Sequence, residues 1–498
     1  MRTLILLLLI LSSVWDSRCV AQQPGDLDNS FGTGGMVVMH YAPWTDMTIQ
    51  PDGKILAVSD VIARYKIDGT LDSSFGVNGI DTIRIDSMSQ VVGSAIALQP
   101  DGKILIAAGP VYVNTDLKDF LLIRYNTDGS LDSSFGGDGF ALADINSGSD
   151  DYSYEVVVQA DGKIIVSGAS DQKLALCRYN SNGSLDSTFD YDGKLILNDI
   201  NIGFSSNWSH ATYMKLQADE KILAGSSSLF ARLNPDGSLD NSFGNNGLKG
   251  LPASMNDLAI QPDGKIVLAG GGGDFVIIRL DSSGNFDNNF GTGGVTTTSA
   301  GMPNCSNPGH MATSVTLQPD GRILAGGYNW CCLLHDCREF VLMRYNEDGS
   351  PDSTFNSDGK VTTGFFEFSS ESHASAITPD LKLVLAGYSY YFDYGGLARY
   401  HLGTMLDVKN LPVASGNIII APNPTRDRIT IKASAIENGT WRIEILDQTG
   451  RSLLRESVTV NSNSLQKEVS LNRLEDGMYF LKMTGAHQQM TYKVVKGE

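Results

Sequence analysis

Long apolar runs are nearly absent from this sequence. The one such stretch, MRTLILLLLILSSVWDSRCVA at residues 1–21, joins a basic residue to an apolar run and a small-residue site that ends at Ala21. This pattern is typical of a secretory signal, and the run is too short to cross a membrane as a helix. No later stretch has the length and apolarity of a transmembrane segment. We therefore expect an exported chain whose mature part starts near residue 22.

Catalytic signatures and positive charge are also scarce. The motifs G-x-S-x-G and H-E-x-x-H and the Walker phosphate loop do not occur. Residues 22–410 carry a net charge of −22, and residues 411–498 carry +2. Such acidity disfavours nucleic acids and anionic membranes as partners. We expect no cofactor and no resident metal, and we favour a non-enzyme.

Two motifs, in contrast, recur along the chain. The first is RYNTDGSLDSSFGGDG at residues 124–139. Its six full copies place an arginine eleven residues before a phenylalanine: Arg64/Phe75, Arg124/Phe135, Arg178/Phe189, Arg232/Phe243, Arg279/Phe290 and Arg344/Phe355. The second is the turn QPDGK, with seven copies that begin at residues 50, 99, 159, 217, 261, 318 and 378. A fixed spacing that recurs in this way predicts a repeat architecture.

Each repeat predicts four short strands. Pro-Asp-Gly suits a tight turn, because proline presets φ at the first corner and glycine accepts positive φ at the exit. Apolar runs flank this turn, and the segments FALAD at 140–144 and FLLIRYN at 120–126 supply the other two strands. Seven such repeats predict an all-β fold, a seven-bladed β-propeller over residues 22–410. A β-solenoid is the alternative.

The lengths of the connections predict two different faces. The PDG turn and the Arg-to-Phe segment are nearly constant, whereas the phenylalanine-to-lysine distance runs from 22 to 32 residues and the lysine-to-arginine distance from 10 to 22. Alternate connections of a meander lie on opposite faces, so both variable loops share one face, which is the candidate functional face. We expect a binding surface there, with these aromatic candidates: Trp44, Trp208, Tyr328, Trp330 and Tyr391. His40, His210, His310 and His373 fall on the same face.

Each arginine of the first motif precedes an aspartate by eight residues. We interpret these residues as seven bidentate ion pairs that lock the connection to its blade; a ring of anion sites, or calcium bound by the Asp-Gly turns, is the alternative. The pairs are Arg64/Asp72, Arg124/Asp132, Arg178/Asp186, Arg232/Asp240, Arg279/Asp287, Arg344/Asp352 and Arg399/Asp407.

The seventh repeat has Asn410 where a phenylalanine should stand. The chain also begins, after residue 22, with the connector PGDLDNSFGTGG and no strand before it. We therefore predict that Phe31 supplies the missing wedge where the first and last blades meet.

Four of the cysteines lie in the enlarged loops of the sixth repeat: Cys305, Cys331, Cys332 and Cys337. In an exported protein two disulfides are expected, since adjacent Cys331 and Cys332 do not pair readily with each other. Zinc is the alternative, because His310 and His335 are near in sequence. We predict that Cys177 is a buried free thiol.

The repeats stop at a linker, residues 411–417. Residues 418–498 alternate short strands with glycine turns, which predicts a small, Ig-like β-sandwich.

The pattern RYNxDGSLDxSFGxxG…LQPDGKILxAG over residues 24–407 resembles the delta-60 repeat of bacterial exported proteins. That resemblance implies a propeller and no particular activity. The tail is similar to the C-terminal sorting domain of the type IX (Por) secretion system of Bacteroidetes. The matching residues include Pro422, Asn423, Pro424, Gly477, Tyr479, Lys493 and Lys496.

The sorting resemblance implies passage through the outer membrane with the type IX machinery as partner, followed by release or surface attachment. Together these features predict a monomeric, non-catalytic module that binds a protein or a glycan. The alternative is a polysaccharide lyase or hydrolase with its site at the ring axis on the variable face.

Overall fold

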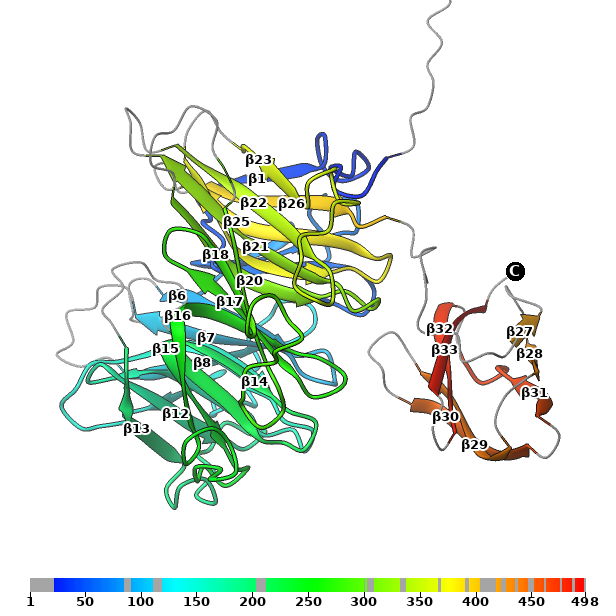
Figure 1. Ribbon diagram of the computed structural model, residues 1–498. Helices are drawn as coiled ribbons and strands as arrows, with labels where there is room; N and C mark the ends of the chain where they lie inside the picture. The colour runs from blue at the N-terminus through cyan, green and yellow to red at the C-terminus, as the bar shows by residue number, and fades with distance from the viewer. Residues whose placement is uncertain are drawn as a thin grey trace, which may run out of the picture. The chain divides into compact units, whose positions relative to one another are not determined.

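The structure is a computed structural model, and no helix in the part of the chain it describes has the length and apolarity to span a bilayer. The chain divides into two compact units, Met1–Thr404 and Met405–Glu498, each described by itself (Figure 1). The structure describes residues 22–498 with these exceptions: 85–90, 111–118, 203–211, 300, 302–308, 332–336, 366–368, 390–393, 404–417, 422–426, 435–437, 447–451, 461–462, 475–476, 486–488 and 497–498.

The first unit consists of antiparallel sheets, each a meander of consecutive strands. The first sheet holds β2 (Asp46–Ile49), β3 (Ile55–Val58), β4 (Val61–Tyr65) and β5 (Ile80–Thr82). The second holds β6 (Val91–Leu98), β7 (Ile104–Pro110), β8 (Phe120–Tyr125) and β9 (Phe140–Ala143). The third holds β10 (Asp151–Val158), β11 (Ile164–Ser170), β12 (Lys173–Tyr179) and β13 (Lys194–Asn201).

A six-stranded sheet follows, with β14 (Tyr213–Leu216), β15 (Ile222–Leu233), β16 (Leu248–Ile260), β17 (Ile266–Gly271), β18 (Phe275–Leu280) and β19 (Val295–Thr298). The next sheet holds β20 (Gly309–Leu317), β21 (Ile323–Cys331), β22 (Cys337–Tyr345) and β23 (Lys360–Thr363). The last holds β24 (Ser370–Ile377), β25 (Lys382–Ser389), β26 (Tyr394–His401) and the N-terminal strand β1 (Met36–His40).

The six-stranded sheet contains two repeats because β15 and β16 are long strands that each pair with one strand along their first part and with another along their second part. The start of β15 pairs with β14 and its end pairs with β16, with Ser227 between them at φ 52°. The start of β16 pairs with β15, and its end pairs with β17. In the part of the chain that the structure describes, the seven sequence repeats therefore occupy six hydrogen-bonded sheets.

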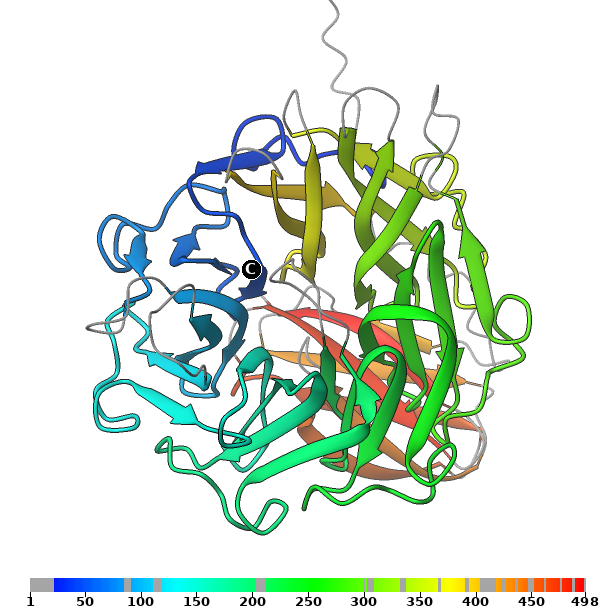
Figure 2. The same ribbon diagram turned by 90° about the vertical axis from the view of Figure 1, so that its left-hand side faces the viewer.

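The inner strands contact one another around a closed ring, in the order β2, β6, β10, β14, β16, β20, β24 and back to β2. Figure 2 shows the sheets arranged around the axis of this ring. The ring closes where β1 pairs with β26, from Met36 opposite Ala398 to His40 opposite Tyr394. The protein is thus an all-β propeller, and both ends of this unit meet in one sheet.

The PDG turn forms the hairpin between the inner two strands of a sheet. Between β6 and β7, the Gln99 amide donates to the Lys103 carbonyl, and the Gly102 amide donates back to the Gln99 carbonyl. Gly102 has φ 83°, a conformation that glycine adopts without a steric cost. The QPDGK motif therefore sets the register of the hairpin.

The Arg-to-Phe segment joins the outer two strands of the same sheet, as from β8 to β9. It does not lead from one sheet to the next: that link is the variable connection after the fourth strand. The constant connections still share one face, the turn face. The variable ones share the opposite loop face.

Apolar side chains of adjacent sheets pack between them. Leu56 and Val58 of β3, for example, cluster with Ile104 and Ile106 of β7, and all four are fully buried. The strands alternate such residues with others that pack on the preceding sheet, so each sheet is apolar on both faces.

The second unit is a two-sheet sandwich. One sheet holds β27 (Ile418–Ala421), β28 (Arg428–Ser434) and β31 (Ser464–Ser470); the other holds β30 (Ser452–Val460), β29 (Gly439–Leu446), β32 (Gly477–Thr484) and β33 (Gln489–Lys496). Ile429 and Ile431 of the first sheet share one core with Trp441 and Leu481 of the second. The predicted β-sandwich is therefore present.

Candidate functional site

Each repeated arginine joins two neighbouring repeats. Arg124 donates from Nε to Asp132 Oδ2 at 2.7 Å, from Nη1 to the Ser181 carbonyl of the next repeat, and from Nη2 to Ser134 Oγ at 3.3 Å. Its guanidinium also lies 4.5 Å from the centroid of the Phe135 ring. In all seven repeats the arginine Nη1 reaches a carbonyl of the following turn. The arginine is thus a joint between blades.

The predicted bidentate geometry is wrong for this pair, because only Nε contacts the carboxylate and the other nitrogens are used elsewhere. Sequence reasoning also missed the third partner: Lys103 of the PDGK turn donates to Asp132 Oδ2 at 2.7 Å. Burial raises the pKa of Asp132, but Lys103, Ser134 and Arg124 together hold it well below its usual range. A buried carboxylate with three such partners is a scaffold element.

The seventh arginine has a partner that was not predicted. Arg399 pairs with Asp28 at 2.7 Å through Nε and Nη2, and Asp407, its predicted partner, lies outside the described residues. Its guanidinium lies 4.6 Å from the centroid of the Phe31 ring, and Lys382 Nζ contacts Asp28 at 2.7 Å. The prediction for Phe31 is confirmed. The segment LDNSFG at residues 27–32 also supplies the aspartate, because Asp28 precedes Phe31 by the three residues found in the other repeats.

The phenylalanines are wedges against the glycine of the next turn. A Cβ at Gly129 would lie 2.9 Å from the Gly76 nitrogen and 3.0 Å from the Phe75 ring, and Gly129 has φ 90°. The same contact joins Phe135 to Gly183. The Asp-Gly pairs are therefore fixed by packing as well as by turn geometry.

The aromatic candidates of the loop face have different positions. Trp44 is fully buried, with its ring edge-on to Tyr65 at 6.1 Å and against Gly395 of β26, so its assignment to an exposed binding face is wrong. It fills the junction of the first and last sheets. Trp208 and Tyr391 lie outside the described residues.

Tyr328 and Trp330 come together at the loop-face end of β21. Their ring centroids are 5.7 Å apart, and both side chains are half-buried. From the next sheet, His373 stacks on Tyr388 at 4.7 Å with an interplanar angle of 6°, and it lies 6.4 Å from Tyr328. We call Tyr328, Trp330 and Tyr388 the aromatic cluster; it is built by two repeats.

A charged network lies beneath this cluster. Arg338 of β22 forms an ion pair with Glu371 of β24 and lies 5.7 Å from the Tyr328 ring centroid. Glu371 Oε2 is 3.4 Å from His373 Nε2. Glu371 and His373 are only 1% and 5% exposed, and burial, followed by the Arg338 charge, lowers the pKa of His373 to about 3. Sequence reasoning missed Arg338 and Glu371 because neither belongs to the repeat.

The described residues include only some of the cysteines for which disulfides were predicted. The register of β21 and β22 places Cys331 opposite Cys337, while Cys305 and Cys332 lie outside the described residues. His310 is buried, with Nε2 3.3 Å from Ser299 Oγ, and His335 lies outside the described part. Cys177 is a buried free cysteine, as predicted, and burial raises the pKa of its thiol to about 12.

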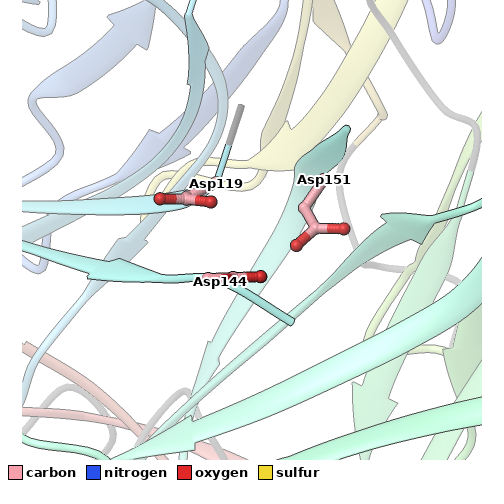
Figure 3. A group of neighbouring side chains, drawn as sticks. All are labelled: Asp119, Asp144 and Asp151. Atoms are coloured by element: carbon pink, nitrogen blue, oxygen red, sulfur yellow. The ribbon is translucent and has the colours of Figure 1, made fainter. Parts of the chain in front are cut away.

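Three carboxylates gather on the loop face where the second and third sheets meet. Oxygens of Asp119, Asp144 and Asp151 lie within 4.8 Å of one another (Figure 3). Calcium takes six to eight oxygen ligands, so these three would need further donors. Asp151 already accepts hydrogen bonds from the Ile145 amide at 2.6 Å and Ser149 Oγ at 2.8 Å. The three carboxylates could hold a cation, but the position of the Asp151 side chain is already explained by its two hydrogen bonds.

The inner strands bring four more charges toward the ring axis. Asp46 and Asp257 each accept from an amide of the next inner strand, Ile96 at 2.9 Å and Val315 at 2.8 Å. Lys215 lies 3.5 Å from Asp257. Burial raises the pKa of Glu155 to about 8 against the opposing effect of Lys215. The two aspartates join inner strands, which is a structural role.

In the tail, two of the predicted sorting segments pair with each other. Gly477 of β32 lies opposite Lys496 of β33, and Phe480 lies opposite Lys493. Tyr479 is 8% exposed in the sandwich core. Pro422, Asn423 and Pro424 lie outside the described residues.

Two known family profiles match the sequence. "Domain of unknown function (DUF5122) beta-propeller" matches residues 50–75, 99–135, 159–189, 217–243, 261–290 and 318–355. "Secretion system C-terminal sorting domain" matches residues 419–497. A search of the curated proteins finds no match.

Several solved structures are similar to this chain at low identity. The extracellular domain of the putative hybrid two component system BT3049 from B. thetaiotaomicron has a TM-score of 0.41 at 10% identity, covering 93% of this chain and 57% of that one. A protein from Lactobacillus plantarum has a TM-score of 0.40 at 11% identity, covering 87% and 99%. This chain thus spans little more than half of the first protein's length. At such scores these similarities bear on neither activity nor ligand.

Proposed function

Because the chain is built of DUF5122 (delta-60-like) β-propeller repeats and ends in a type IX secretion sorting domain that directs it to the cell surface or outside, we propose that it is a non-catalytic binding module for a glycan or a protein. The loop face is the binding surface. The repeated side chains make contacts within and between blades, so the ligand must be recognised by residues that do not repeat.

The aromatic cluster is the observation that carries this proposal. Tyr328 and Trp330 are half-buried, and Arg338, which is paired with the buried Glu371, lies 5.7 Å from the Tyr328 ring centroid. Flat aromatic rings beside polar groups suit the apolar faces of sugar rings as well as protein side chains. The cluster combines large contact area with side chains that are already held in place, which lowers the entropic cost of binding.

A glycan array with the purified chain tests this proposal, followed by titration calorimetry on any ligand found. Trp330→Ala should weaken binding about tenfold or more and leave the melting temperature nearly unchanged. Tyr41→Ala is the control. Tyr41 is 77% exposed on the same face, and it directly follows β1, the outer strand of the last sheet. Equal affinities for wild type and Trp330→Ala would contradict the proposal.

The rival function is a polysaccharide lyase or hydrolase, and one observation favours it. Arg338, Glu371 and His373 lie in mutual reach, as acid–base chemistry requires. Burial of Glu371 and His373 argues against direct contact with a substrate. A reducing-sugar assay over a polysaccharide panel decides: release that Glu371→Gln abolishes would replace the binding proposal with an enzyme.

The division of the chain is part of the proposal. We assign residues 1–21 to a signal peptide, 22–410 to the propeller, 411–417 to a linker and 418–498 to the sorting domain. We also assign the four cysteines of the sixth repeat to two disulfides, which the register of Cys331 with Cys337 supports. Alkylation of native protein with and without reductant, read by mass, tests the disulfides; four free thiols before reduction would contradict them.

A further inference from the structure

A pocket of about 610 Å³ opens on the turn face, between the third and fourth repeats. It is lined by both PDG-type turns, QADGK at 159–163 and QADEK at 217–221, and by the turn that contains Asp236. It lies on the face opposite the aromatic cluster, so it is independent of the function proposed above.

This junction departs from the repeat at the position of the turn glycine. Five repeats place glycine there with φ of 83–90°, whereas the fourth repeat has Glu220 at φ 65° and the seventh has Leu381 at φ 62°. A side chain in this left-handed conformation carries a steric cost. The first residue after Phe189 also departs from the usual glycine: it is Asp190 at φ 43°, where five other repeats have glycine.

Glu220 reaches across to the preceding repeat. Its carboxylate accepts from Gln159 Nε2 at 3.2 Å and from the Ala160 amide at 3.4 Å. The long contacts leave the carboxylate with acceptor capacity at the pocket wall. No equivalent link is made where glycine occupies the turn, because glycine has no side chain.

The pocket lining holds more carboxylates than cations, although each aspartate already has a partner: Asp161 and Asp219 lie 3.6 Å from Lys163 and Lys221, and Asp236 accepts hydrogen bonds from Ser238. Lys163 and Arg178 both contact Asp186, at 3.1 Å and 2.7 Å. The pocket wall also holds Asp161, Asp219 and Asp236, and the side chains of the first two are 56% and 60% exposed. The pocket therefore presents a surplus of negative charge.

Gln159 adds a buried acceptor. It is 4% exposed, it lines the pocket, and its Oε1 has no hydrogen-bond partner among the described residues. The same oxygen lacks a partner in the other five repeated glutamines. Only at this junction does it stand beside an acid that has replaced the turn glycine. A buried acceptor of this kind calls for a donor.

We propose that this pocket binds an organic cation with several N–H donors, a guanidinium or ammonium group carried on a flexible chain. Glu220 and Asp236 supply the charge, and Gln159 Oε1 accepts one N–H. A metal ion is a poor fit, since among the described residues the group of three carboxylates that converges within 4.8 Å is Asp119, Asp144 and Asp151, not this one.

Titration calorimetry of the full chain at low ionic strength tests the proposal. The probes are acetyl-Gly-Arg-Gly-amide, spermidine, the neutral acetyl-Gly-Gln-Gly-amide and calcium chloride. We expect millimolar or tighter binding of at least one organic cation, weakened by salt, and no heat from the last two probes. Binding of the peptide alone identifies a protein side chain as ligand; binding of spermidine alone identifies a free polyamine.

Glu220→Gly should weaken that binding at least about tenfold, since it removes a charged acceptor. The variant should fold, because glycine stands at this position in five other repeats. Leu381→Gly is the matched control: Leu381 occupies the same turn position in the seventh repeat at φ 62°, away from the pocket. Equal binding by Glu220→Gly, or no binding of either cation by the wild type, overturns the proposal.

Discussion

Asp28→Asn tests whether the ring is held closed by its N-terminal segment. Asp28 is 1% exposed and takes contacts from Arg399 Nε, Lys382 Nζ and Ser30 Oγ, each at 2.7 Å. The amide leaves two buried cations without their anion. Loss of one partner from a buried ion pair costs about 3–5 kcal/mol. The first unit should melt about 4–6 °C lower, by scaling the unfolding entropy to its length.

Asp132→Asn is the matched control. Asp132 makes the same kinds of contact, with Arg124, Lys103 and Ser134, and all three residues are near it in the chain. Asp28 and Arg399, in contrast, are 371 residues apart. Both variants should lose similar stability. Only Asp28→Asn should expose the amides of β1 and β26 to hydrogen exchange, because only there does the lost pair tie the two ends together.

The reasoning would be refuted if β1 and β26 kept full protection in Asp28→Asn. It would equally fail if Asp132→Asn exposed them to the same extent. A deletion of residues 22–35 that melts at the full-length temperature would show that the closing segment contributes nothing.

Three other predictions concern packing and pH. In acid, the repeated aspartates with depressed pKa contribute stability that is present above the unfolded pKa of about 4 and is lost as pH falls further, so urea midpoints should drop steeply below that pH. Burial raises the pKa of the Glu155 carboxyl to about 8, so stability is lost as pH rises from the unfolded pKa of about 4 to the folded value; Glu155→Gln should stabilise the chain by about 1–2 kcal/mol at pH 9, where that loss is complete, and have no effect at pH 4. Gly129→Ala should cost at least about 2 kcal/mol because its Cβ meets Phe75, whereas Gly137→Ala, with φ 104° and open space, should cost about 1 kcal/mol; equal costs in urea unfolding would contradict the wedge.

The fold followed from the repeat because constant spacing reflects constant geometry. The arginine, the phenylalanine and the PDG turn contact the same partners seven times, so a single sequence displays the contact repeatedly. The lysine of PDGK was missed as a partner because its aspartate lies in the other motif, as for Lys103 and Asp132. Asp28 was missed because it lies far from Arg399 in the chain.

The loop face was harder to predict, for a physical reason. Trp44 has the same polar sequence neighbours as an exposed aromatic residue, and only the meeting of the first and last sheets buries it. Arg338 comes from β22, whereas Glu371 and His373 come from β24 of the next sheet, and none of the three belongs to the repeat. Their proximity depends on how two sheets pack, which no spacing along the chain records.

The pairing of Asp28 with Arg399 has a consequence for the order of events during synthesis. Residues near the N-terminus are made first, yet their strand partners in β26 follow about 370 residues later. Until then the closing strand has no edge to join, and bringing the two ends together afterwards costs chain entropy on the order of 5 kcal/mol. The last hydrogen bonds of the ring therefore form only after nearly the whole propeller has been made, and a partly synthesised chain remains an open arc with an unpaired strand at each end.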